Sequence, residues 1–263
     1  MFTKQQIMDS LQTFSFAVGR PVLVHSSLRA VGEVEGRGEG LLDCLISFFT
    51  QRGGLLCIPT HTWDFDEMNM VTGRVCIGTL PYLAATDTRA LRTLHPTHSM
   101  AIYGERDRAE AFAAEEVFAE TPAPPNGCYG KLCAQDGNIL LLGVGHNRNT
   151  YLHSVEEMLQ VPNRLSREKR NIRMIYADGR EELRQIYSHC AEGIGDVSAR
   201  YPKYEAAFRY HECITDGMIG NAKAQMCRAR AMYEVLVRIY QRSGGRELMY
   251  DDAPIPRALY ELS

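Results

Sequence analysis

The chain has 263 residues, 45% of them hydrophobic and 23% charged, a composition typical of a folded globular protein that argues against disorder. Lys and Arg total 29 against 32 Asp and Glu, and a formal net charge of −3 provides no positive field to attract nucleic acid. Because no run approaches the roughly 18 apolar residues of a membrane helix, we expect a cytoplasmic protein with neither a nucleic-acid nor a membrane partner.

The first predicted elements are a helix, a strand, a second helix and a second strand. Thr3 and Gln6 form a capping-box pattern ahead of apolar residues at helical spacing. PVLV at 21–24 and LLCIP at 55–59 are short apolar runs typical of buried strands. Between them lies the pattern of a core-facing helix, formed by Leu41, Leu42, Leu45, Phe48 and Phe49. This order predicts a βαβ unit with parallel strands, which sets the fold class as α/β.

The rest of the chain gives fewer elements. NILLLGVG at 138–145 predicts a third strand, whereas residues 64–95 show little periodicity and yield no prediction. TPAPPNG at 121–127 is a proline-rich loop that we expect to cross the mouth of a site. Alternation about Asp178-Gly179 predicts an antiparallel hairpin, and a long helix is predicted after Gly220. We expect residues 1–263 to form a single domain with an elaborated C-terminal half.

Polar residues follow each of the three predicted strands, where α/β sheets bind their ligands. His25, Ser26 and Ser27 follow the first strand, and Thr60 and His61 follow the second. Of the eight histidines, six lie in such segments or in loops: His25, His61, His95, His98, His146 and His153. Imidazole serves both as a general base and as a metal ligand, so both interpretations stay open at this point.

TYLHSVEE at 150–157 is the segment that best fits general-base chemistry. Thr150, His153 and Glu156 or Glu157 share one face of a predicted helix. A carboxylate bonded to one ring nitrogen would fix the imidazole tautomer and raise the basicity of the other nitrogen. The alternative is a solvated helix that carries an incidental pair. In HPTHS at 95–99 we expect at least one histidine to be structural.

Two further patterns concern phosphate and metal binding. The glycine-rich residues 27–40 precede a helix whose free amides suit a phosphate, but the segment lacks the lysine of a nucleotide-hydrolysing P-loop. A cofactor phosphate and a plain glycine-rich loop are both compatible with it. The eight cysteines are scattered and form no C-x-x-C, and the gap between Cys128 and Cys133 fits no common zinc knuckle. We therefore expect reduced core thiols and no metal.

Taken together, the segments resemble the aminoglycoside 3-N-acetyltransferases and the wider antibiotic N-acetyltransferases, a family associated with antibiotic resistance. The resemblance is carried by VHSSLRAVG at 24–32, GLLDCLISFFTQRGGLLCIPTHTW at 40–63, RTLHPTHSMAIYG at 92–104, GNILLLGVGHNRNTYLHSVEE at 137–157 and GMIGNA at 217–222. It implies a three-layer α/β/α fold with a central, largely parallel sheet and a C-terminal antiparallel and helical elaboration, unlike the common small-acetyltransferase fold. It also implies acetyl-CoA as donor and direct transfer to an amine, the 3-amino group of an aminoglycoside.

The resemblance also implies roles for individual residues. The family's T-x-x-H-x-x-E pattern falls on Thr150, His153 and Glu156, with His153 as the general base and Glu156 as its orienting partner. The residues it places on the acetyl-CoA side of the cleft are His25, Ser26, Ser27, Leu28, Thr60, His98 and Ser99. TPAPPNGCYGKL departs from the family's usual loop, because Tyr129 stands where a tryptophan is usual.

Two other functions remain open from the sequence. A metal-dependent hydrolase would use the clustered histidines, although the sequence lacks H-x-H and H-E-x-x-H. A relative that binds CoA or a drug without catalysis would carry the same loops. The sequence does not decide whether the chain forms a homo-oligomer.

Overall fold

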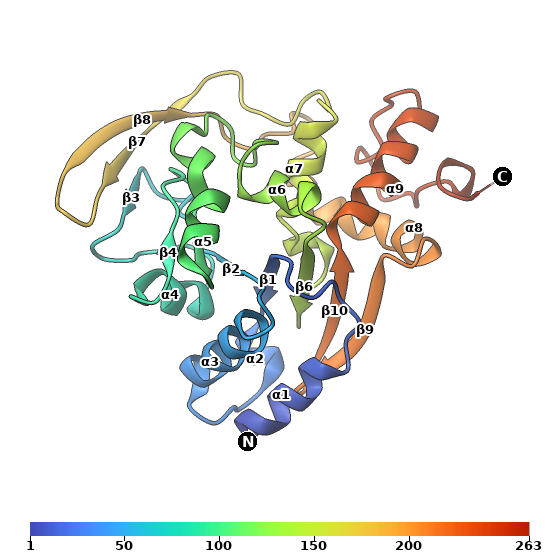
Figure 1. Ribbon diagram of the computed structural model, residues 1–263. Helices are drawn as coiled ribbons and strands as arrows, with labels where there is room; N and C mark the ends of the chain where they lie inside the picture. The colour runs from blue at the N-terminus through green and yellow to red at the C-terminus, as the bar shows by residue number, and fades with distance from the viewer. Residues whose placement is uncertain (263) are drawn as a thin grey trace.

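The computed structural model describes residues 1–262 and is built on a mixed sheet of seven strands (Figure 1). These strands are β1 (Val22–Ser26), β2 (Leu56–Pro59), β4 (Leu91–Arg92), β5 (Met100–Tyr103), β6 (Asn138–Leu142), β9 (Ile214–Ile219) and β10 (Ala222–Arg228). Their order is β4-β5-β2-β1-β6-β10-β9. The central strands β2, β1 and β6 are parallel, and the flanking strands pair antiparallel. The predicted α/β class and βαβ unit are confirmed, with the parallel pairing confined to the centre of the sheet.

Side-chain alternation along the central strands explains why the fold has three layers. In β1, Leu23 belongs to one buried cluster, and Val22 and Val24 belong to another. Leu141 and Leu140 in β6 divide in the same way. Because successive side chains of a strand point to opposite faces, apolar residues at every position require cover on both faces.

Helices provide that cover on both faces of the sheet. They are α1 (Lys4–Gln12), α2 (Leu28–Val31), α3 (Arg37–Thr50), α4 (Thr79–Thr86), α5 (Arg106–Ala113), α6 (Cys128–Ala134), α7 (Tyr151–Met158), α8 (Glu205–Tyr210) and α9 (Ala229–Arg242). The 3₁₀ turns are η1 (Ala114–Phe118), η2 (His146–Arg148), η3 (Val197–Tyr204) and η4 (Arg257–Leu259). Residues of α1, α3 and α4 pack into one core, and residues of α5 to α9 pack into the other. Figure 1 shows the two groups of helices on opposite sides of the sheet.

The N-terminal predictions are confirmed in detail. Thr3 caps α1 in a reciprocal capping box with Gln6. The five apolar residues predicted to face the core from α3 are all buried. Within residues 1–262 no helix is long and apolar enough to cross a membrane.

A second, three-stranded sheet lies outside the main sheet. It consists of β3 (Glu67–Asn69), β7 (Arg170–Ile175) and β8 (Glu181–Ile186). The predicted hairpin about Asp178-Gly179 is confirmed: it joins β7 to β8, and Gly179 takes a φ of 81°, which favours glycine. The stretch 64–95, for which the sequence predicts no element, contains β3, α4 and β4. These elements are short, and α4 includes Pro81 in its first turn. Neither the helical nor the strand periodicity of apolar residues is therefore long enough to detect in the sequence.

The prediction of a long helix directly after Gly220 is wrong about where the helix begins. Gly220 and Asn221 turn the chain between β9 and β10, and α9 starts only at Ala229. Gly220 has a φ of 58°, as such a tight turn requires. The predicted core-facing residues of α9 are nevertheless buried: Met232, Val235, Leu236 and Ile239.

Candidate active site

A cleft of about 870 Å³ opens at the carboxyl ends of the central parallel strands. Its walls include the end of β1, the residues that follow β2, and residues 144–153 after β6. A further wall comes from residues 187–198, which follow β8. The polar segments that the sequence places after three separate strands therefore do meet, because parallel strands end at the same edge of a sheet. The volume is in the range of small-molecule and cofactor sites.

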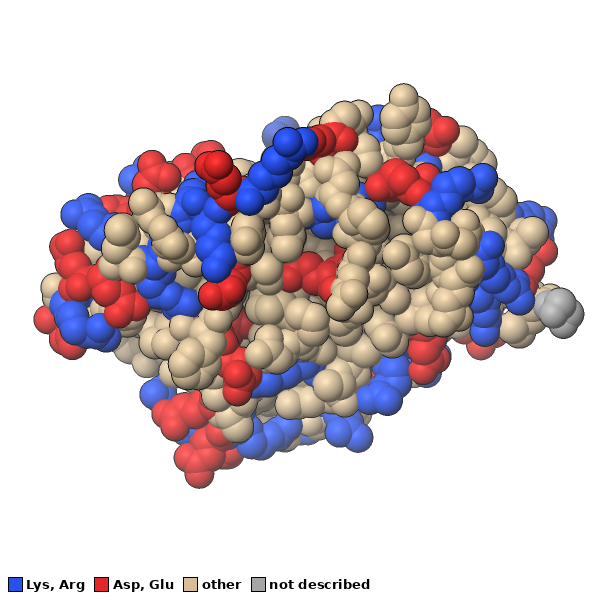
Figure 2. All heavy atoms as spheres, turned by 90° about the horizontal axis from the view of Figure 1, so that it is seen from above, with Lys and Arg blue, Asp and Glu red and all other residues tan. Residues whose placement is uncertain are grey.

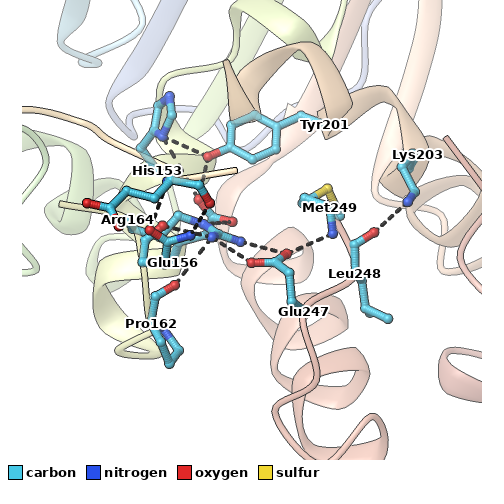
Figure 3. A network of polar contacts seen from close by, with 11 residues as sticks. His153, Glu156, Pro162, Arg164, Tyr201, Lys203, Glu247, Leu248 and Met249 are labelled. Atoms are coloured by element: carbon cyan, nitrogen blue, oxygen red, sulfur yellow. Dashed lines mark hydrogen bonds and ion pairs between the residues drawn. The ribbon is translucent and has the colours of Figure 1, made fainter. Parts of the chain in front are cut away.

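His153 lies in this cleft on α7, and a tyrosine connects it to a carboxylate (Figure 3). The Tyr201 hydroxyl donates to Glu156 Oε2 at 2.6 Å and lies 2.7 Å from His153 Nδ1. A tyrosine has one hydroxyl proton, so Nδ1 must donate to the tyrosine oxygen. His153 Nε2 then carries the lone pair. The sequence predicts Glu156 as a direct partner, but its Oε2 is 4.0 Å from Nδ1 and acts through Tyr201.

Arg164 holds the other side of the Glu156 carboxylate. Its Nε lies 2.8 Å from Oε1 in an ion pair, and both side chains are about 5% exposed. The same guanidinium donates to both carboxylate oxygens of Glu247, at 2.8 and 3.0 Å. Burial raises the pKa of Glu156, and the Arg164 charge and the Tyr201 hydroxyl oppose this rise. Arg164 thus stabilises the carboxylate that Tyr201 contacts.

His189 stacks on His153 and extends a cluster of imidazole rings. The two ring centroids are 3.8 Å apart with an interplanar angle of 24°. His98 lies edge-on to His189 at 5.1 Å and 4.5 Å from His61. All of these rings line the cleft. Sequence reasoning missed His189, although it follows the predicted hairpin about Asp178-Gly179, just as His25 and His61 follow predicted strands.

Burial keeps these imidazoles neutral near pH 7. Desolvation lowers the pKa of His25 to about 3 and that of His189 to about 4. Burial likewise places the pKa values of His61, His98 and His153 well below the usual 6.5, and the neighbouring histidines lower them further. A neutral imidazole with a free lone pair can accept a proton, so His153 is in the form that a general base requires.

The HPTHS segment separates into one structural histidine and one histidine at the cleft. His95 Nδ1 accepts from the backbone N–H groups of Thr97 and His98, at 3.1 and 2.8 Å. Its Nε2–H donates to the Thr121 carbonyl at 3.0 Å. Every polar atom of this ring is therefore used by the backbone, which confirms the expectation of a structural histidine. His98 instead lines the cleft, with Nδ1 2.9 Å from the Thr97 hydroxyl.

His25 links the end of β1 to the start of the helix that carries His153. Its Nε2 accepts from the Thr150 backbone N–H at 3.4 Å, and Thr150 is the N-cap residue of α7. His25, Ser26 and Thr150 all line the cleft. Three of the predicted site residues are thus placed together, two on β1 and one at the N-cap of α7.

Other predicted cofactor residues lie behind the cleft wall. The hydroxyls of Thr60 and Ser99 are 2.8 Å apart, and both residues are fully buried, a geometry that favours a structural role. Ser27 caps α2 by accepting from the Ala30 N–H at 3.3 Å, and Leu28 packs against the core. Residues 27–40 contribute nothing to the lining of the cleft. For these residues a contact with CoA stays a prediction.

The proline-rich loop 121–127 reaches the cleft through Pro122. Glu157 anchors it, because its carboxylate accepts from the Thr121 hydroxyl and, at 2.9 Å, from the Ala123 N–H. Burial raises the pKa of Glu157 to about 7. Beyond this loop, the Tyr129 hydroxyl lies 2.5 Å from His61 Nε2. The tyrosine that departs from the usual tryptophan thus contacts one of the clustered histidines.

Two residues around His153 give no local sequence signal. Tyr201 and Arg164 come from η3 and from the segment after α7, and both contact Glu156. Tyr201 lies 48 positions from His153, so no helical or strand spacing connects them. Within the described part of the chain, no group of three or more His, Cys, Asp or Glu is arranged to hold a metal ion.

Comparison with known proteins shows one consistent family. A family model described as "Aminoglycoside 3-N-acetyltransferase" matches residues 23–241. The chain is 26% identical to aminoglycoside N(3)-acetyltransferase IV of Salmonella sp, over 96% of each chain.

Solved structures share the fold. The apoenzyme of aminoglycoside acetyltransferase AAC(3)-IVa superposes with a TM-score of 0.77 and 24% identity, covering 96% of this chain and 92% of that one. A histidine-to-alanine mutant of AAC(3)-IVa, in complex with a gentamicin, gives a TM-score of 0.78 and 24% identity, covering 92% and 90%.

Proposed function

Since the chain belongs to the aminoglycoside 3-N-acetyltransferase family, whose named members are enzymes, we propose that it transfers the acetyl group of acetyl-CoA directly to an amine. The relatives' names point to an aminoglycoside-type acceptor and its 3-amino group. The observation that carries the proposal is the chain of contacts from His153 through Tyr201 to Glu156 at the wall of the cleft.

In the proposed reaction, His153 Nε2 takes a proton from the acceptor nitrogen as that nitrogen attacks the thioester carbonyl. The C–N bond forms, the C–S bond breaks, and the imidazolium returns its proton to the departing CoA sulfur. While His153 is charged, its Nδ1–H donates to Tyr201, which in turn donates to the Glu156 carboxylate. This chain stabilises the imidazolium, as the orienting acid of a catalytic triad does.

The residues of the cleft fit CoA as the donor substrate. CoA carries phosphates and a long apolar and amide arm. Arg148 on η2 is exposed, lines the cleft, and makes no side-chain hydrogen bond or ion pair with the rest of residues 1–262, so its charge is available to a phosphate. Val24, Pro59 and Ile77 provide apolar wall, and Ser26 provides a hydroxyl.

A thiol-release assay tests the proposal. The protein is mixed with acetyl-CoA and a panel of amines that includes aminoglycosides, and free CoA thiol is measured against a reaction without amine. We expect amine-dependent thiol release and an acetylated amine detectable by mass spectrometry. Calorimetry with acetyl-CoA alone is the accompanying measurement. Binding of acetyl-CoA without turnover on any amine would instead support the non-catalytic alternative.

A further inference from the structure

Trp63 is the only tryptophan of the chain, and it lies on the wall of the cleft. It comes four positions after the end of β2 and is 47% exposed. Its indole ring makes no hydrogen bond or aromatic contact with the rest of residues 1–262. Tyr187, the other large aromatic residue of the lining, already has the Lys169 ammonium 5.2 Å from its ring centroid. Trp63 thus leaves a broad aromatic surface open to a ligand.

The backbone on both sides of Trp63 is fixed by hydrogen bonds. The Thr62 N–H donates to the Thr97 carbonyl at 2.8 Å, and the Thr62 hydroxyl donates to the Pro96 carbonyl at 3.1 Å. After it, Arg170 donates to the Trp63 carbonyl at 2.6 Å. A tryptophan side chain has only two rotatable bonds, so holding it still on a fixed backbone costs little conformational entropy when a ligand binds. Trp63 is therefore largely preorganised for binding.

The face of an indole ring attracts two kinds of group. Its π electrons make the face negative, so a cation above it is attracted, more strongly than above Tyr or Phe. Apolar C–H surface that packs on the same face is removed from water. A ring of an aminoglycoside offers both, because its C–H bonds form an apolar face and its ammonium groups are cationic. The adenine of CoA also offers a stacking surface, so the position of Trp63 and the charge around it must decide between the two ligands.

The strand order separates Trp63 from the side of the cleft proposed for the phosphates of CoA. Trp63 follows β2 and Arg148 follows β6, and β1 lies between these two strands. Two inter-strand spacings correspond to roughly 10 Å along the edge of the sheet. On the side of Trp63, the cluster of imidazole rings begins at His61 and continues to His153. An acceptor of several linked rings can therefore cover Trp63 with one ring and present an amine of another ring to His153.

The charges next to Trp63 favour a cationic ligand. Asp64 follows it in the same turn, is exposed, and forms no ion pair with the rest of residues 1–262. Arg170 lines the cleft but pairs with Asp66, at 3.8 Å, rather than with Asp64. Figure 2 shows acidic and basic side chains interspersed over the face of the molecule seen from above, so no broad patch of one sign overrides these local charges.

We propose that Trp63 is the surface on which one amino-sugar ring of the acceptor stacks, with an ammonium of that ring beside Asp64. This inference rests on the proposed acetyltransferase function. It gives Trp63 a role in recognising the acceptor and none in moving the proton. Loss of Trp63 should therefore raise the KM for the acceptor and leave the KM for acetyl-CoA unchanged.

Tryptophan fluorescence of the wild-type protein tests the position of the ligand directly, because its single tryptophan is Trp63. Gentamicin, which has no aromatic ring, and CoA are titrated separately, with excitation at the long-wavelength edge of the tryptophan band to avoid tyrosine. We expect gentamicin to move the emission to shorter wavelength, because a stacked ring excludes water from the indole, and CoA to leave the emission unchanged. Unchanged emission at saturating gentamicin, or a shift with CoA alone, would overturn the inference.

Three variants test the two parts of the surface. Trp63→Ala removes the aromatic ring, so it should weaken gentamicin binding in calorimetry and raise the KM for gentamicin by about tenfold, with kcat within about twofold. Trp63→Phe keeps a smaller aromatic face and should bring both values back to within about threefold of the wild type. Asp64→Asn should weaken gentamicin binding by about threefold at low salt and by less at high salt, because salt screens an exposed ion pair.

Tyr82→Ala is the matched control. Tyr82 is an aromatic residue on α4 that is 48% exposed, as Trp63 is, but it lies outside the lining of the cleft. Its replacement should change neither gentamicin affinity nor KM. Equal effects of Tyr82→Ala and Trp63→Ala would contradict the role of Trp63.

Thiol release by the same proteins separates this inference from the proposed function. Turnover of gentamicin with an unchanged KM in Trp63→Ala overturns the role of Trp63 and leaves the acetyltransferase in place. Gentamicin binding that shifts the emission and is weakened in Trp63→Ala, without turnover on any amine, overturns the proposed function and leaves the binding surface in place.

Discussion

Acidification should destabilise this protein steeply below about pH 6.5, because the fold buries many neutral histidines. The histidines whose pKa values burial lowers are His25, His61, His95, His98, His146, His153 and His189. In the unfolded chain each returns to a pKa of 6.5 and binds a proton that the folded protein excludes. Their contribution to stability is complete above pH 6.5 and is lost as the pH falls below it.

The size of the effect follows from the net number of protons. Between about pH 6 and pH 5, seven histidines take up nearly one proton each on unfolding. Buried carboxyls act in the opposite direction, because burial raises the pKa values of Glu116 and Glu157 to about 7 and raises that of Glu156. Seven protons less the two of Glu116 and Glu157 leaves about five, and any proton that Glu156 binds in the folded protein lowers this to about four. Each proton is worth ~1.36 kcal/mol per pH unit. The free energy of unfolding should therefore fall by about 5 to 7 kcal/mol, as much as the total stability of many domains.

Urea unfolding followed by circular dichroism at a series of pH values measures how steeply the free energy of unfolding changes with pH. His189→Gln removes one histidine whose pKa burial lowers, so it should make this change smaller by about 1.4 kcal/mol per pH unit. Glu116→Gln keeps an acceptor for the Cys128 N–H but removes a carboxyl whose pKa burial raises. It should therefore make the free energy of unfolding change more steeply with pH, by about the same amount. A fall of less than about 1 kcal/mol between pH 6 and pH 5 in the wild type would refute the reasoning.

The remaining predictions concern the reaction. His153→Ala should lower kcat by roughly 10²- to 10⁴-fold with acetyl-CoA affinity nearly unchanged, measured by thiol release and calorimetry; near-normal kcat would show that the base lies elsewhere. Tyr201→Phe removes the hydroxyl that bridges His153 and Glu156. A hydrogen bond to a charged group is worth ~1.5–3 kcal/mol, so kcat should fall by about 10- to 100-fold, and the acid limb of the pH profile of kcat should shift. Glu156→Gln should cost less than His153→Ala, because the base stays in place; a larger loss would indicate that the carboxylate itself reacts. Exhaustive chelation should leave the rate unchanged, and a loss restored by zinc would favour the hydrolase alternative.

The sequence predicts the parts of this fold whose signal is local. The buried face of α3 and the capping box of Thr3 follow from helical spacing within a few residues. The parallel pairing of β1 and β2 follows from the order of elements, because a crossover helix joins strands in one direction. The start of α9 does not follow from the sequence, because residues 222–228 combine the alternation of a strand with residue types that favour a helix. Their pairing with β6 decides the strand, and that contact is long-range.

The same division between local and long-range signals holds for the site. The edge of the sheet where the cleft lies is predictable, because polar residues such as His25 and His61 directly follow apolar strands. The spacing of His153 and Glu156 predicts a shared helical face, which is correct. It does not predict that their distance is 4.0 Å or that a tyrosine lies between them. Tyr201 reaches them from η3, whose position is set by the packing of the C-terminal half.

The orientation of His153 therefore depends on contacts from three separate parts of the chain. The start of α7 is bonded to β1 through Thr150 and His25, and the ring of His153 is bonded to η3 through Tyr201. Arg164 joins the partner carboxylate to Glu247, which lies beyond α9. A histidine held only by its own helix would sample several rotamers, and each wrong rotamer would direct Nε2 away from the substrate. Because the C-terminal segments supply two of these three restraints, changes there should affect the alignment of the base before they affect the sheet that carries it.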